Sequence, residues 1–283
     1  MNGKAKPRWP SWGAIAAWAL ACLLCLLYVA PVAMLVVGSL KPDARVLVEA
    51  GSWRAFWAAG ASLANYRDVF ARVDLGRFLL NSLFITASVV VSGLVANSLA
   101  GYAFARLAWR GRQWLFAGVA ALMVLPFEAI AVPLFYGASL LGLRDTYTVQ
   151  IVPFVANGFA IYLFYSFFLG LPRELEEAAR IDGAGTLRTF VTIVAPNARP
   201  CFATVAILTF LTQWGSYLWP LLVTAGPRVR PLPVAIAAFY TLPPRQWGDI
   251  LAFGVVMAAP VVLLFLLFQR AFVRGVATTG LKG

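Results

Sequence analysis

Histidine is absent from this 283-residue chain and cysteine occurs only three times, which removes several kinds of site. A Ser–His–Asp triad and a histidine-based metal centre both need imidazole groups. Cys22 and Cys25 form a C-x-x-C pattern, but the pattern lies inside the apolar run WALACLLCLLYVA. A redox pair needs a stabilised, accessible thiolate, so two small side chains on an apolar helix is the better interpretation. No G-x-x-x-x-G-K-[ST] run occurs either, so the chain does not bind ATP through a P-loop.

Charge is also scarce, whereas apolar side chains dominate. Charged residues make up 12% of the chain and hydrophobic residues 61%, compared with about 45–50% apolar residues in a typical soluble domain. The net charge of +12 is a feature of nucleic-acid-binding proteins, but Lys and Arg lie in short gaps between apolar runs and form no continuous face. In membrane proteins such charges anchor helices and set their orientation. The composition therefore predicts an integral membrane protein.

Six apolar stretches have the length of about 20 residues that a membrane-spanning helix needs. They cover approximately residues 12–39, 78–105, 114–140, 149–170, 201–225 and 250–273. The first stretch is longer than the apolar core of a cleaved signal peptide, about 7–15 residues, so we expect a retained helix. Six spans place successive connecting segments on alternating sides of the membrane, with both termini on the same side. When the long 40–77 loop is left out, most Lys and Arg lie in the segments on the side of the amino terminus. Because cytoplasmic segments carry an excess of Lys and Arg, this distribution predicts that both termini are cytoplasmic.

The predicted inward loop at 171–200 contains an unusually polar segment, EEAARIDGAG, at positions 176–185. Pro172 is suited to begin a helix. Glu176 and Arg180 have the favourable i, i+4 order of acid before base, and Gly183 permits the left-handed turn that often ends a helix. A second amphipathic segment, TLRTFVTIVAP, follows. The pattern predicts two short helices that meet at a glycine turn on the cytoplasmic membrane surface.

This loop resembles the signature of importer permeases of the ATP-binding-cassette class. That signature is E-A-A, three residues, Gly, nine residues, Ile, one residue and Leu-Pro. Its matching residues here are Glu177, Ala178, Ala179, Gly183, Ile193 and Pro196, with Ala195 in place of the leucine. Stretches along nearly the whole chain resemble the carbohydrate-uptake permeases of the maltose, trehalose and glycerol-phosphate type. They are LANYRDVF, NSLFITASVV, GYAFARLAWRGR, LWPLLV and FVRGVATTGLKG.

The resemblance implies an all-α, type I importer permease with six transmembrane helices in one domain over residues 1–283. The 171–200 loop would contain a coupling helix that docks on an ATPase through Glu177, Ala178, Ala179, Asp182 and Gly183. This subunit would be non-catalytic and hold no metal or cofactor, because ATP and Mg would be bound by two partner ATPases. A homologous second permease and an extracytoplasmic solute-binding protein would complete the assembly in the bacterial inner membrane, with no nucleic-acid partner.

Polar residues inside the predicted spans are candidates for a solute path, because they are costly to place in lipid. The candidates that we select are Glu128, Asn157, Gln213, Trp214 and Tyr217. Thr209, Gln213 and Ser216 also share one helical face. Counted along a straight helix at 1.5 Å per residue, Glu128 lies about 15 Å below the outer surface. Amides, hydroxyls and aromatic rings suit sugars, but hydrogen bonding between helices is an equally open role for these side chains.

Three other functions stay open at this point. An ion-driven secondary transporter would need several intramembrane charges, and Glu128 is the only acid inside the predicted spans. A membrane enzyme would need a catalytic cluster, and the loop acids have no His or Cys beside them. An importer permease of the same class for another solute, such as amino acids or phosphate, is disfavoured only by the resemblance to carbohydrate permeases.

Overall fold

The computed structural model describes the backbone of residues 12–279 and the side chains of residues 12–269. The basic leader with Lys4, Lys6 and Arg8 lies outside these residues, as does the end of the FVRGVATTGLKG stretch. Within residues 12–279 the regular structure is helical and contains no strand, so the predicted all-α class is confirmed. The chain divides into two compact units, Met1–Val73 with Tyr240–Val256 and Asp74–Phe239 with Met257–Gly283.

The first unit begins with a long apolar helix. Its elements are α1 (Trp12–Ser39), α2 (Asp43–Glu49), the 3-10 helix η1 (Trp53–Phe56), α3 (Ala64–Arg72) and the start of α15 (Trp247–Thr279). The 28 residues of α1 contain no charged side chain, and most of its large apolar side chains are exposed. A helix that is apolar on all sides belongs in a membrane or a large core, and its length is sufficient to cross a bilayer.

A buried lysine organises the segment that follows α1. The Lys41 side chain is 2% exposed, and its Nζ donates to Glu49 Oε2 at 2.9 Å and to the Arg54 carbonyl at 2.5 Å. Asn65 Nδ2 donates to the carbonyls of Ser39 and Lys41. The Lys41 ammonium holds the pKa of the Glu49 carboxyl below its ordinary value. Together these bonds tie α2, η1 and α3 to the end of α1.

A second buried ion pair closes the same unit. Arg72 Nη1 lies 2.8 Å from Asp249 Oδ2, and the Asp249 side chain is only 2% exposed. The sequence analysis did not predict this pair. Nothing in the local sequence indicated it, because the two residues are 177 positions apart.

The second unit contains most of the remaining helices. They are α4 (Leu75–Arg106), α5 (Arg112–Leu122), α6 (Phe127–Leu140), α7 (Tyr147–Val155), α8 (Gly158–Leu169), α9 (Glu174–Ile181), α10 (Thr186–Thr189), the π-helix η2 (Phe190–Val194), α11 (Ala195–Asn197), α12 (Arg199–Trp214), α13 (Leu218–Val223) and α14 (Leu232–Tyr240).

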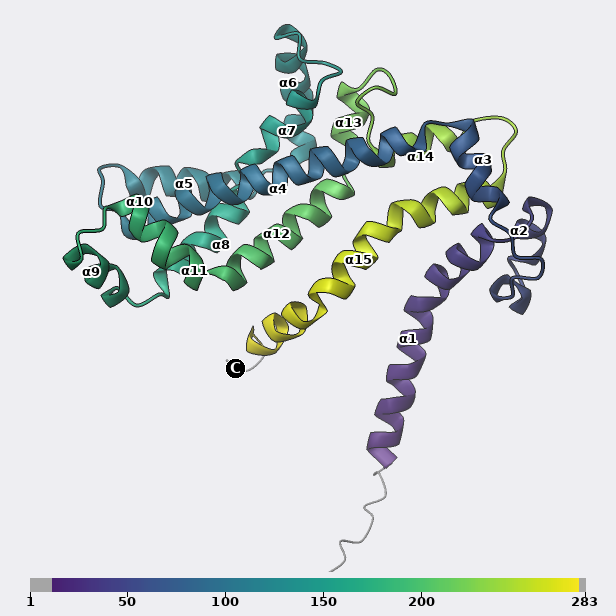
Figure 1. Cartoon of the computed structure of the whole chain (residues 1–283), viewed down its shortest axis with the longest axis horizontal. Helices are drawn as coiled ribbons and strands as arrows, with labels where there is room; N and C mark the ends of the chain where they lie inside the picture. Colours follow the sequence, from purple (N-terminus) through teal and green to yellow (C-terminus); the bar gives the residue numbers. More distant parts are fainter. Residues whose placement is uncertain (1–11, 280–283) are drawn as a thin grey trace, which may run out of the picture. The chain divides into compact units, whose positions relative to one another are not determined.

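Helix α4 is the scaffold of this unit and packs against α7, α8 and α12 (Figure 1). Gly101 permits a close approach of α4 to α8, since a Cβ there would lie 2.6 Å from Phe164 Cβ. Small residues allow helix backbones to approach in this way in membrane proteins. Phe164 and Phe168 are fully buried at this contact, with ring centroids 5.7 Å apart. The α4–α8 pair is therefore a close-packed support for the sites described below.

Several of the expected spans are interrupted rather than straight. Helices α5 and α6 are bent by 102°, with Pro126 immediately before α6, and the segment 186–197 meets α12 at 80° beside Pro200. Proline lacks the N–H that would continue a helix. The expected helix over 201–225 stops at Trp214 and resumes as α13. By length and composition, four helices suffice to cross a membrane among the described residues, or six if each bent pair is one span.

Candidate functional site

The polar loop begins with α9 and turns at Gly183. Gly183 has a φ of +78°, in the left-handed region that favours glycine, so the predicted turn is confirmed. The Gly183 N–H donates to the Arg180 carbonyl at 3.0 Å, and the Ala184 N–H donates to the Ala179 carbonyl at 2.9 Å. These bonds satisfy carbonyls at the end of α9 that would otherwise have no partner.

Helix α9 has one buried face and one exposed face. Ala179 is 4% exposed and lies on the buried face, although it was predicted to be part of the docking surface. Glu177, Ala178 and Asp182 are exposed, as is Gly183. The structure thus presents four of the five predicted coupling residues on the accessible side of the loop.

Glu176 anchors the buried face of α9 to the end of α4. Its Oε2 accepts a hydrogen bond from Tyr102 Oη at 3.0 Å, and its Oε1 lies 3.1 Å from Arg106 Nε. The Arg106 contact is an ion pair without an aligned hydrogen bond. Arg106 Nη2 also donates to the Leu171 carbonyl. The predicted pairing of Glu176 with Arg180 is wrong, because the carboxylate is buried with Arg106 while Arg180 stays exposed.

This buried network of Tyr102, Arg106 and Glu176 makes α9 part of the α4 scaffold. A buried charge is stable only when it is paired, and removing one partner of such a pair typically costs about 3–5 kcal/mol. Sequence reasoning missed the network because Tyr102 and Glu176 are 74 positions apart. The stretch GYAFARLAWRGR, which contains both α4 residues, was the one available signal.

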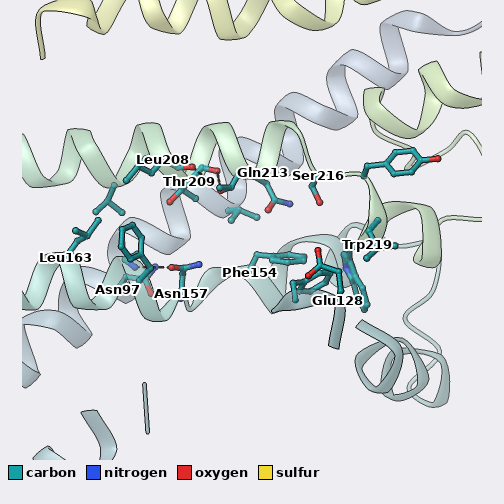
Figure 2. A pocket seen from close by; sticks show the side chains of 18 residues that line it. Asn97, Glu128, Phe154, Asn157, Leu163, Leu208, Thr209, Gln213, Ser216 and Trp219 are labelled. Carbon is teal, nitrogen blue, oxygen red and sulfur yellow. Dashed lines mark hydrogen bonds between the residues drawn. The ribbon is translucent and has the colours of Figure 1, made fainter. Parts of the chain in front are cut away.

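A cavity of about 700 Å³ lies elsewhere in the same unit, lined by residues of α4, α6, α7, α8, α12 and α13 (Figure 2). This volume is within the range of about 300–1,000 Å³ that is common for ligand pockets. Four of the predicted path residues line it: Glu128, Asn157, Gln213 and Tyr217. The structure therefore brings together side chains that come from three separate parts of the chain.

A polar stripe along the end of α12 and the residues just after it forms one wall of this cavity. Figure 2 shows Thr209, Gln213 and Ser216 on one side, with Phe154 and Glu128 on the other. Among the described residues, no hydrogen bond or ion pair engages the side chains of these four polar residues. Their hydrogen-bonding groups are therefore available to a ligand.

Asn97 and Asn157 share a different arrangement on the cavity wall. Asn97 Nδ2 donates to the Val155 carbonyl, and Asn97 Oδ1 accepts from the Asn157 N–H, both at 2.9 Å. Asn157 Oδ1 caps α8 by accepting from the Ala160 N–H at 2.9 Å. Sequence reasoning found Asn157 but missed Asn97, which satisfies the backbone groups left open by the break between α7 and α8.

Two expectations for the cavity are corrected by the structure. Glu128 lies in the first turn of α6, just after the 102° bend, so a depth counted along a straight helix does not apply. Trp214 does not line the cavity: it is 4% exposed, and its Nε1 donates to the Met257 carbonyl at 3.0 Å. One step along a helix rotates the side chain by about 100°, so Trp214 points away from the stripe that contains Gln213.

Residues 75–278 match the family described as "Binding-protein-dependent transport system inner membrane component". The chain belongs to this family. The match includes α4, the polar loop and the cavity. The prediction of an importer permease from the loop signature is therefore confirmed.

The permease is similar over most of its length to named transport proteins. It is 34% identical to the arabinooligosaccharides transport system permease protein AraQ of Halalkalibacterium halodurans, covering 90% of this chain and 91% of that protein. It is 33% identical to the trehalose/maltose transport system permease protein MalG of Thermococcus litoralis, covering 79% and 82%. It is 35% identical to the sn-glycerol-3-phosphate transport system permease protein UgpE of Yersinia pestis, covering 71% and 72%. These names confirm the resemblance to carbohydrate-uptake permeases.

The fold of the permease also matches a solved structure. The crystal structure of a bacterial ABC transporter involved in the import of the acidic polysaccharide alginate superposes with a TM-score of 0.82 at 23% identity, covering 94% of this chain and 99% of that chain. The permease is thus an all-α inner-membrane component of an ABC transport system. Its relatives are named as transport permeases, so it is a transport subunit and not an enzyme.

Proposed function

We propose that this permease imports a sugar or sugar-derived solute across the bacterial inner membrane by alternating access, driven by separate ATPase subunits. The observation that carries the proposal is the cavity, in which unengaged amide and hydroxyl groups of Gln213, Thr209 and Ser216 face aromatic rings. Hydroxyl-rich solutes hydrogen-bond to the first set and stack on the second. Relatives named for arabinooligosaccharides and for trehalose and maltose support this solute class.

The coupling segment of this proposal is the 171–200 loop, with α9 as the coupling helix. Its exposed residues Glu177, Ala178 and Asp182 contact an ATPase surface, where small side chains permit close packing. Gly183 sets the turn into the next helix, and Ala179 packs the coupling helix against the permease itself. Because Glu176 is ion-paired with Arg106, a displacement of α9 is passed to α4. ATP and Mg are bound by the ATPase, and this chain holds no cofactor.

The proposed assembly contains a homologous second permease, two ATPases and an extracytoplasmic solute-binding protein. The binding protein docks on the outer loops at 40–77 and 226–249. Both chain termini lie in the cytoplasm, a placement supported by the distribution of Lys and Arg over the shorter loops. The whole chain acts as one transmembrane permease domain.

Variants of α9 test the coupling. We expect Glu177→Ala and Gly183→Asp to reach the membrane in normal amounts but to abolish uptake, because they remove an interface charge and strain the turn. Glu174→Ala, an exposed first-turn residue of the same helix, is the matched control and keeps full activity. The measurements are immunoblots of membranes, uptake of labelled arabinotriose and maltotriose, and ATPase rates in proteoliposomes. Normal uptake and ATPase stimulation in both test variants would refute the coupling role.

A further inference from the structure

The cavity wall carries one negative charge and no positive charge. Glu128 is the only charged residue among those that line it, since the lining contains neither Lys nor Arg. None of the ion pairs formed by the described side chains includes Glu128. Its carboxylate is thus left uncompensated by this chain and faces the space that a solute would occupy (Figure 2).

The backbone of the cavity wall does not restore a preference for anions. The amino-terminal end of a helix attracts negative charge, and α6, α8 and α13 all begin at the cavity. Glu128 itself occupies the first turn of α6. In α8 the first turn is already capped by the side-chain oxygen Oδ1 of Asn157. Helix α13 has only six residues, so its dipole is short.

The remaining wall suits a neutral molecule with many hydroxyl groups. Thr209, Gln213 and Ser216 offer uncharged donors and acceptors opposite Phe154. The Trp219 indole N–H already donates to the Val149 carbonyl at 2.8 Å, so this residue contributes its apolar ring. A hydroxyl group that donates to the Glu128 carboxylate would form a charge-assisted hydrogen bond, which is stronger than one between neutral groups.

We propose that Glu128 is a specificity-determining residue that rejects anionic solutes, so that the imported solute is a neutral, hydroxyl-rich molecule such as an unmodified oligosaccharide. Phosphorylated, sulfonated and uronic sugars would each bring a second negative charge into the same weakly screened space. This inference rests on the proposed function for the nature of the solute, but the sign of the cavity charge can be tested without knowing the solute.

The first test measures the charge with thiol reagents. In the intact transporter, Cys22, Cys25 and Cys201 of this chain are replaced by alanine and Thr209→Cys is introduced in the cavity. Its rates of modification by a cationic and an anionic methanethiosulfonate are compared, each corrected for the reagent's rate with a free thiol. We expect the cationic reagent to be favoured, and Glu128→Gln to reduce the ratio on the order of tenfold. The conservative variant Glu128→Asp keeps the ratio. A ratio that Glu128→Gln does not change overturns the proposal.

The second test measures transport of labelled arabinotriose and sn-glycerol 3-phosphate by the complete system with native cysteines. We expect uptake of the neutral trisaccharide only, and a several-fold loss of that uptake in Glu128→Gln, because a charged acceptor becomes a neutral one. Uptake of glycerol 3-phosphate by the unmodified transporter overturns the inference. If neither solute is taken up while the reagent ratio still depends on Glu128, the proposed sugar function fails and the assignment of the cavity charge stands.

Discussion

The buried network that holds α9 leads to a quantitative prediction about the stability of this helix. Glu176→Ala would leave the Arg106 guanidinium without its carboxylate, although the Arg106 side chain is only 4% exposed. Breaking a buried pair in this way typically costs about 3–5 kcal/mol. At about 1.4 kcal/mol for each factor of ten, local opening of α9 should become more frequent by about two to nearly four orders of magnitude.

Hydrogen exchange of the α9 backbone amides in the intact transporter measures this opening. Glu176→Ala should reduce their protection strongly. Tyr102→Phe should have a smaller effect, about 1.5–3 kcal/mol, because it removes one hydrogen bond to a charged group and leaves the ion pair intact. Glu174→Ala, which changes an exposed acid on the same helix, should change protection little. Alanine is the best helix former, so lost protection in Glu176→Ala cannot come from helix propensity.

A functional measurement accompanies the exchange data. If α9 no longer moves with α4, ATP hydrolysis should continue with little solute uptake in proteoliposomes. The ratio of solute transported to ATP hydrolysed should therefore fall in Glu176→Ala more than in Tyr102→Phe. Equal amide protection in Glu176→Ala and Glu174→Ala would refute the argument, because it would show that the buried pair does not hold the helix in place.

Two further predictions concern stability. Asn97→Leu should lower the Tm of the purified permease, because it removes the hydrogen-bond partners of the Val155 carbonyl and the Asn157 N–H. Each unpaired group should lower the free energy of unfolding by about 1–3 kcal/mol. The control Ser92→Ala should have little effect, because the Ser92 hydroxyl bonds only within α4. The second prediction concerns pH, because Lys41 lowers the pKa of Glu49. Their pairing should stabilise the segment after α1 fully at pH values above the ordinary carboxyl pKa. This stabilisation should be lost as the pH falls through the lowered pKa of Glu49. Amide exchange in η1 should show this acid dependence, and Lys41→Met should abolish it.

The sequence predicted those features that depend on composition and local pattern. Long apolar runs gave the membrane class, the helical spacing of Thr209, Gln213 and Ser216 gave one polar stripe, and Gly183 gave the turn. Each signal is local, because hydropathy, helical period and glycine conformation are properties of neighbouring residues. The membrane class could be predicted because helices that contact lipid need long apolar segments, and such segments are visible directly in the sequence.

The features that the sequence did not predict depend on distant contacts or on breaks in helices. The local sequence offers Arg180 as a partner for Glu176, but Glu176 pairs with Arg106 because both side chains are buried at the same contact. Trp214 follows Gln213 directly in the sequence, but its side chain packs away from the cavity and donates a hydrogen bond to the Met257 carbonyl. The 102° bend before Glu128 likewise changes where the residue lies without changing the apolar pattern around it. The periodicity of apolar residues in the sequence predicts neither the ion pair, nor the direction of the Trp214 side chain, nor the bend.

The position of Asn97 and Arg106 on one helix has a mechanical consequence. Nine residues separate them, about 14 Å along an α-helix at 1.5 Å per residue. Asn97 fixes the cavity wall and Arg106 holds α9, so about two and a half turns of α4 form a short stiff rod between the cavity and the loop that we propose to contact the ATPase. Such a rod transmits rotation as well as translation. Inserting a single residue between the two would turn one end by about 100° relative to the other, so this short section of α4 must keep its length even where its individual side chains are free to vary.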